Sequence, residues 1–138
     1  MALHPAEEAT ILAFVVPAKR ERLLGLLGSR KRRKQALDSL NHFTGWDPRY
    51  MQSLPSSSDM VRALRQAGAP DACHVISDAR ELDGRDLPLA DAVAAAETHD
   101  FATVLCCLPG KVACFFDEVY APRNRVLLRR DVGARSRT

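Results

Sequence analysis

The chain has 138 residues, of which 46% are hydrophobic and 27% charged, with a formal net charge of +3. A globular domain of this size buries enough surface to fold without a structural metal or disulfide. No apolar run reaches the roughly 18 residues of a membrane-spanning helix, and no cationic segment precedes the first apolar run as in a signal peptide. We therefore expect a cytoplasmic protein that does not contact a membrane.

The charges are distributed unevenly along the chain. Residues 1–50 carry a net charge of +4, residues 51–120 a net charge of −6 and residues 121–138 a net charge of +5. Two interpretations are open: the charges cover solvated faces and pair in part across the fold, or they form a basic surface for an anionic partner.

The first half of the chain is predicted to be mainly helical. Pro5, followed by two glutamates, suits the first turn of a helix, although a strand over Ile11–Val16 is also compatible with the β-branched residues there. Pro17 can begin a second helix with a leucine-rich face. A third helix is predicted over Arg30–Phe43. Its apolar stripe has spacings of three and four and consists of Ala36, Leu37, Leu40 and Phe43.

Five consecutive cations begin this third helix. They are Arg30, Lys31, Arg32, Arg33 and Lys34. With Ser29 as the N-cap, each would lie at the positive end of the helix dipole and cost up to about 1 kcal/mol at low salt. Either the helix continues unbroken through Gly28, or the acidic middle of the chain packs against the cluster, or the cluster binds an anionic partner.

The middle of the chain alternates loops with short elements. Residues 52–58 form the most loop-like stretch and can act as a hinge. A short helix from Asp59 to Gly68 follows, then a strand over Cys73–Ser77 and a polar loop over 78–86. An alanine-rich helix is predicted over Leu89–Thr98.

Two apolar runs, Thr103–Leu108 and Lys111–Phe116, are separated by Pro109-Gly110, a pattern typical of a β-hairpin. Both arms are almost continuously apolar, so both faces of the hairpin are expected to be covered. An exposed hairpin arm could also pair with a second copy of the chain, which leaves a homo-oligomer open.

The four cysteines are predicted to be buried apolar residues, because no pair has the spacing of a zinc site. A two-residue turn places Leu105 opposite Cys114 and Cys107 opposite Val112. Cys107 and Cys114 then share one face of the hairpin, and Cys106 points to the other. A redox or metal role is the alternative.

The predicted elements define an α+β fold. A final strand is expected over Arg125–Arg130, and residues 131–138 form a basic tail expected to be flexible. A helical part over about residues 1–68 should pack on a small, mostly antiparallel sheet within residues 70–130, with the order β-α-β-β-β. We predict a single domain over residues 1–130.

No phosphate-binding glycine motif is present, and the loop over 78–86 lacks two oxygen ligands of a calcium-binding EF-hand. We therefore predict no metal and no cofactor. A looser metal site is the alternative, from the acids Asp78, Glu81, Asp83 and Asp86.

Three side chains are the candidates for catalysis: His74, Asp78 and Asp117, which can gather at strand ends. His74 and Ser77 lie three residues apart on one strand, so their side chains point to opposite faces and cannot form a catalytic pair.

The sequence favours a small non-enzymatic binding or regulatory module over an enzyme. Its partner would be nucleic acid or an acidic protein surface, bound through Arg30–Lys34, and arginine outnumbers lysine sixteen to four, which suits phosphate. The alternative is a small enzyme that uses His74, Asp78 and Asp117.

Overall fold

The computed structural model describes residues 3–40, 44–54, 59–98, 101–117 and 125–130. The helices of these residues are α1 (Pro5–Phe14), α2 (Pro17–Leu27), α3 (Arg33–Leu40), α4 (Met60–Gln66) and α5 (Leu89–Thr98), with a 3-10 helix η2 (Pro48–Tyr50). The strands are β1 (Met51–Leu54), β2 (Ala72–Ser77), β3 (Asp86–Pro88), β4 (Thr103–Leu108), β5 (Val112–Phe116) and β6 (Arg125–Arg129).

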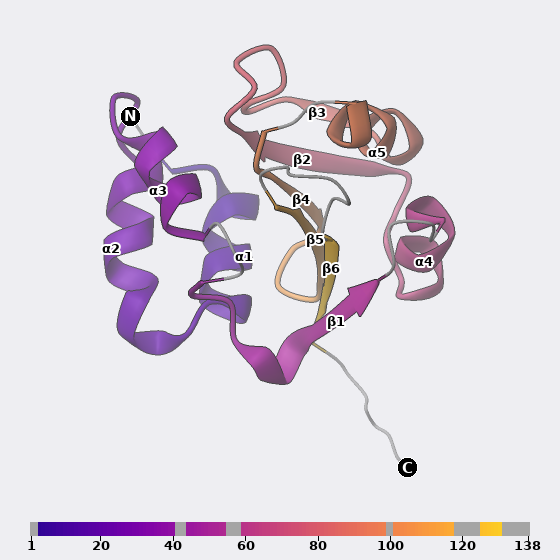
Figure 1. The fold of residues 1–138 in the computed structure, drawn as a ribbon, viewed down its shortest axis with the longest axis horizontal. Helices are drawn as coiled ribbons and strands as arrows, with labels where there is room; N and C mark the ends of the chain where they lie inside the picture. The colour runs from indigo at the N-terminus through magenta and orange to yellow at the C-terminus, as the bar shows by residue number, and fades with distance from the viewer. Residues whose placement is uncertain (1–2, 41–43, 55–58, 99–100, 118–124, 131–138) are drawn as a thin grey trace.

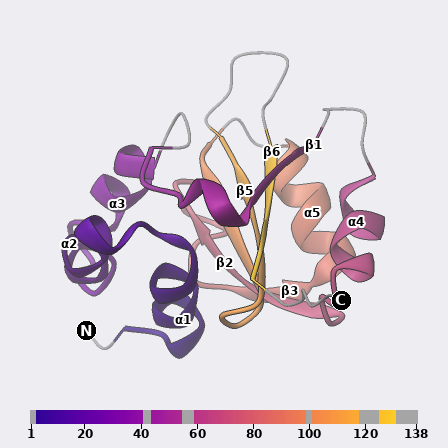
Figure 2. The ribbon, with the colours of Figure 1, turned by 90° about the horizontal axis from the view of Figure 1, so that it is seen from below.

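The strands form one antiparallel sheet in the order β1-β6-β5-β4-β2-β3. Helices α1, α2 and α3 cover one face of this sheet, and α4 and α5 cover the other (Figures 1 and 2). The predicted α+β class is confirmed, with helices on both faces. None of the described helices combines the length and the apolar character needed to cross a membrane.

Two short edge strands were absent from the predicted order. Strand β1 pairs with β6, and β3 pairs with β2, so each lies at one edge of the sheet. Neither strand has the alternating apolar residues by which a strand is recognised in a sequence. An edge strand of three or four residues is held mainly by its hydrogen bonds to the neighbouring strand. The prediction of a loop over residues 52–58 is therefore wrong for residues 52–54, which belong to β1. Residues 55–58 lie outside the described residues.

The ambiguous first segment forms a helix. Pro5 occupies its first turn, and the side chain of His4 caps it by accepting a hydrogen bond from the backbone N–H of Ala6 at 3.1 Å. Ile11 and Phe14 are buried in the core, and this packing outweighs the weak preference of β-branched residues for strands. The helix ends before Val15, which forms an isolated bridge with Trp46.

A break separates α2 from α3. Helix α2 ends at Leu27 with Gly28 as its C-cap, and the backbone N–H of Arg32 donates to the carbonyl of Ser29. Helix α3 therefore begins at Arg33, three residues later than predicted, and the alternative of one helix running through Gly28 is wrong. The predicted end of α3 at residue 43 lies outside the described residues.

The hairpin of β4 and β5 is confirmed, and Leu105 lies opposite Cys114 as predicted. The loop has three residues rather than two, with Gly110 at φ 77°, a conformation typical of a three-residue hairpin loop. Leu108 instead of Cys107 therefore pairs with Val112, and an irregularity after Cys106 absorbs the shift.

The four cysteines are buried and form no disulfide, and the three in the hairpin lie on the predicted faces. Cys106 belongs to the core under α1–α3, whereas Cys107 and Cys114 belong to the core under α4 and α5 together with Cys73. Each cysteine residue is at most 4% exposed, consistent with a packing role.

Candidate functional site

A buried cluster of charged side chains lies between the sheet and α1–α3, and Arg33 is at its centre. Its guanidinium donates two hydrogen bonds to the Glu7 carboxylate, at 2.8 and 3.0 Å, and two to Asp83, both at 2.9 Å. A further bond reaches the carbonyl of Leu27 at 2.9 Å. Burial lowers the pKa of Arg33, but the bonds to Asp83 and Glu7 outweigh burial and raise it. Arg33 thus joins α1, α3 and the loop between β2 and β3.

His74 extends this cluster toward the edge of the sheet. Its Nε2 lies 2.7 Å from Glu7 Oε2, and its Nδ1 lies 2.8 Å from Asp86 Oδ1. Burial lowers the pKa of His74, whereas its bonds to Glu7 and Asp86 outweigh burial and raise it. The ring of His4 stacks on that of His74 with centroids 3.8 Å apart.

The Glu7 carboxylate is hydrogen-bonded both to the Arg33 guanidinium and to the His74 ring. Burial raises its pKa, but its bonds to His74 and Arg33 outweigh burial, so the pKa lies below its ordinary value. The sequence suggested only that Glu7 favours the N-terminus of α1. The structure gives it a second role, because this carboxylate is the link between Arg33 and His74.

The five predicted binding cations do not share one environment. Arg33 points inward, whereas Arg30, Lys31 and Arg32 are exposed in the connection before α3. Among the described residues these three form no ion pair. Lys34 is 70% exposed in its side chain and lies 3.6 Å from Asp38 and 3.7 Å from Asp78. The alternative that the acidic middle of the chain packs against the five cations therefore holds for two of them: Arg33 pairs with Asp83, and Lys34 lies beside Asp78.

A hollow of about 420 Å³ opens where the α2–α3 connection meets the loop between β2 and β3. Four cationic side chains, two acidic ones and a serine line it: Arg30, Arg33, Lys34, Arg80, Asp78, Asp83 and Ser77. Asp83 has a structural role, because it accepts hydrogen bonds from Arg33 and, at 3.0 Å, from the backbone N–H of Ser77. Cations from two distant segments therefore converge on one cavity.

The three catalytic candidates are not brought together in this hollow. Asp78 lines it, but His74 and Asp117 do not. The strand register places Asp78 and Asp117 at the same end of the sheet on opposite sides of β4, since Ser77 pairs with Thr103 and Thr103 with Phe116. His74 lies further back on β2, with both ring nitrogens engaged.

The expectation that His74 and Ser77 point to opposite faces is confirmed. His74 contacts Glu7 of α1, whereas Ser77 Oγ lies 2.8 Å from Thr103 Oγ1 and accepts a hydrogen bond from the backbone N–H of Ala79. A serine–histidine pair on β2 is thereby excluded.

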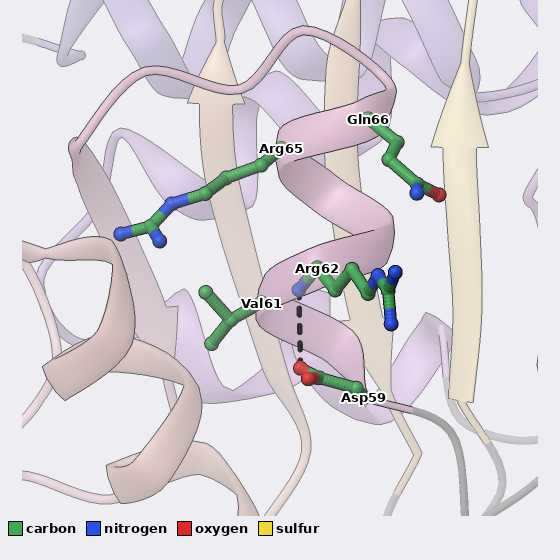
Figure 3. A pocket seen from close by; sticks show the side chains of 5 residues that line it. All are labelled: Asp59, Val61, Arg62, Arg65 and Gln66. Atoms are coloured by element: carbon green, nitrogen blue, oxygen red, sulfur yellow. Dashed lines mark hydrogen bonds between the residues drawn. The ribbon is translucent and has the colours of Figure 1, made fainter.

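A second hollow, of about 430 Å³, lies on the surface of α4 (Figure 3). Figure 3 shows Arg62 and Arg65 extending in different directions from this short helix, while Asp59 caps it by accepting from the backbone N–H of Arg62 at 3.1 Å. Arg65 pairs with the exposed Asp71 at 3.3 Å. The lining contains no buried polar side chain, so we assign it no function.

Comparisons with known protein families, with curated proteins and with solved structures each find no match to this chain. Function therefore has to be inferred from the chain's own residues. Within the described ranges, two features have organised polar chemistry: the Arg33–His74 cluster and the hollow beside Arg30 and Arg80.

Proposed function

We propose that the chain is a non-enzymatic binding module that contacts the phosphates of a nucleic acid. The contact surface, here called the basic face, consists of Arg30, Lys31, Arg32, Lys34 and Arg80. The observation that carries this proposal is the position of Arg80, which comes from the β2–β3 loop and lines the same hollow as Arg30 and Lys34. Convergence of cations from separate segments makes a concave basic surface rather than a single charged loop.

The neighbouring charges favour an anionic ligand at this face. The two acids that line the hollow each lie beside a cation, Asp83 at 2.9 Å from Arg33 and Asp78 at 3.7 Å from Lys34. Arg30 and Arg80 are exposed and keep their guanidinium donors for a ligand. Guanidinium groups donate parallel hydrogen bonds to phosphate oxygens, and these contacts position a nucleic acid without reading its sequence.

The enzyme alternative receives less support from the geometry. A general acid or base has to reach the reacting group, and His74 is only 5% exposed with both nitrogens bonded to carboxylates. Asp78 and Asp117 lie on either side of β4 and do not share the hollow. We therefore favour a binding function over a reaction.

The test is a titration of single-stranded RNA and of duplex DNA by fluorescence anisotropy at several salt concentrations. The test variant combines Arg30→Ala, Lys31→Ala and Arg32→Ala, and it leaves the structural Arg33 intact. The control variant combines Arg62→Ala, Arg65→Ala and Lys111→Ala, which removes the same charge from exposed positions on α4 and at the far end of the hairpin. Circular dichroism establishes that all three proteins are folded.

We expect binding that weakens with salt, with a slope that falls by up to about 2–3 in the test variant, since each lost phosphate contact contributes about 0.7–0.9. The control variant should keep most of the wild-type slope. Absence of binding by the folded wild type at about 50 mM salt would contradict the proposal, because phosphate contacts are strongest at low salt. An acidic protein surface would then be the partner to test.

A further inference from the structure

We propose that His4, His74 and Asp86 bind a divalent transition-metal ion of the zinc class, at a site separate from the basic face. Each residue offers one ligand atom, and these three atoms all lie within 4.8 Å of one another. His4 precedes α1, His74 belongs to β2 and Asp86 begins β3, so three segments contribute one ligand each. His4 and Asp86 are exposed, which gives an ion access from solvent, whereas His74 is buried.

The donor set determines the class of ion. Two imidazole nitrogens and one carboxylate oxygen suit zinc and its neighbours among the divalent transition metals, whereas calcium and magnesium prefer all-oxygen sites. Three protein ligands also leave coordination positions open to water or to a small ligand.

The surroundings of His74 are those of a metal-binding histidine. Such a histidine usually donates its second ring N–H to a carboxylate, which fixes the tautomer and the ring orientation. Glu7 Oε2 lies 2.7 Å from His74 Nε2, and Glu7 is itself held by two hydrogen bonds from Arg33. His74 Nδ1 is left facing Asp86 Oδ1 at 2.8 Å. An ion bound between these two atoms would displace one proton to solvent, since a ligating imidazole must be neutral.

His4 has two roles that exclude each other. Its Nδ1 accepts a hydrogen bond from the backbone N–H of Ala6, so a neutral ring carries its proton on Nε2. Ligation through either nitrogen therefore requires His4 to release Ala6. It also requires the His4 ring to turn out of its stack on His74, because the in-plane lone pairs of two nearly parallel rings do not converge on one ion. The lost cap costs about 1 kcal/mol, which coordination can offset. This competition provides a discriminating substitution: His4→Asn keeps an oxygen for the N-cap and removes the imidazole.

The experiment is a titration of the full chain with Zn²⁺ by calorimetry, in the presence of a non-thiol reductant that keeps the cysteines reduced. Co²⁺ is titrated in parallel and followed by visible absorption. The variants are His4→Asn and Asp86→Asn, and the control is Asp91→Asn, which neutralises an exposed carboxylate in the first turn of α5. His74 is not substituted, because its burial between two carboxylates makes loss of folding an expected side effect.

We expect one Zn²⁺ per chain, with affinity for Zn²⁺ at least about tenfold lower in each ligand variant and unchanged in the control. The Co²⁺ absorption should be lost in the same two variants, and excess Mg²⁺ should not displace Zn²⁺. Failure of the wild type to bind Zn²⁺ would overturn the proposal. Equal affinity in wild type, His4→Asn and Asp86→Asn, all folded by circular dichroism, would also overturn it, because the ion would then be held by other side chains such as His42, His99 or the cysteines.

Discussion

The two faces of the sheet bury different kinds of side chain. Toward α1–α3, the ion pair of Glu7 and Arg33 has side chains that are only 2% and 10% exposed. Toward α4 and α5, the buried residues are mainly apolar or thiols, and the ion pair of Arg125 with Glu97 leaves the Glu97 side chain 42% exposed. The same strands supply both faces, since adjacent residues of a strand point in opposite directions.

This difference shows two ways of holding helices on one sheet. The α4–α5 face is stabilised by burial of apolar area, which tolerates changes that conserve volume. The α1–α3 face adds a charged cluster, in which every donor needs its particular acceptor. The basic face adjoins the α1–α3 side of the sheet. The buried Arg33 therefore fixes the position of the exposed cations beside it in the sequence.

Removal of the central cation should have the largest effect. We expect Arg33→Met to lower the free energy of unfolding by about 3–5 kcal/mol, because the buried Glu7 and the partly buried Asp83 lose their partner. Urea denaturation followed by circular dichroism measures this change. Lys31→Met is the matched control, since this neighbouring cation is exposed and forms no ion pair among the described residues, and it should change stability by less than about 1 kcal/mol. Equal losses in the two variants would mean that the cluster does not stabilise the α1–α3 face.

The thiols provide a chemical comparison of the two faces. Burial raises the pKa of Cys106 to about 12, whereas a hydrogen bond from Cys107 lowers the pKa of Cys73. Near neutral pH Cys106 should therefore carry much less thiolate than an ordinary thiol. Mass spectrometry after limited alkylation of the native protein should find Cys73 labelled before Cys106. Earlier labelling of Cys106 would show that the α1–α3 face opens more readily.

A cavity in the apolar face should cost somewhat less than loss of the central cation. We expect Leu64→Ala to lower the free energy of unfolding by about 2–5 kcal/mol, because Leu64 lies on the inner face of α4 and is fully buried. Leu12→Ala removes the same atoms from a residue that is 44% exposed and should cost far less. Thermal and urea unfolding of the two variants give the comparison. A similar loss in both would indicate that α4 is not packed as described.

The smallest effect is expected for an exposed ion pair on the apolar face. Arg65 pairs with Asp71 at 3.3 Å, and their side chains are 55% and 92% exposed. Arg65→Ala should therefore change the free energy of unfolding by less than about 1 kcal/mol. Urea denaturation at low and high salt is the measurement. A larger, salt-insensitive loss would show that Arg65 contributes through packing instead of charge.

Parts of the fold with strong local signals could be predicted from the sequence. The helix Leu89–Thr98 has the predicted bounds, and Pro109-Gly110 marks the hairpin. The edge strands β1 and β3 could not be predicted, because they are short and depend on neighbours that are distant in the sequence.

The charged cluster was only partly accessible to sequence reasoning. Arg33 lies three residues before Ala36, the first residue of the apolar stripe of α3. The helical spacing therefore places this cation on the buried face. A buried cation requires an anionic partner, but the choice of Glu7 could not be made locally. Glu7 and His74 are 67 positions apart, and only the packing of α1 on β2 brings them together.

Strand β6 lies between β1 and β5, although β1 is made before α4 and all the other strands. During synthesis, β1 therefore has no sheet partner until Arg125–Arg129 has left the ribosome. Its backbone groups stay open to water and to other chains in the meantime, and a late closure over so long a loop is slow. The topology therefore leaves β1 as an unpaired strand, open to chaperones, proteases and aggregation, until β6 is made.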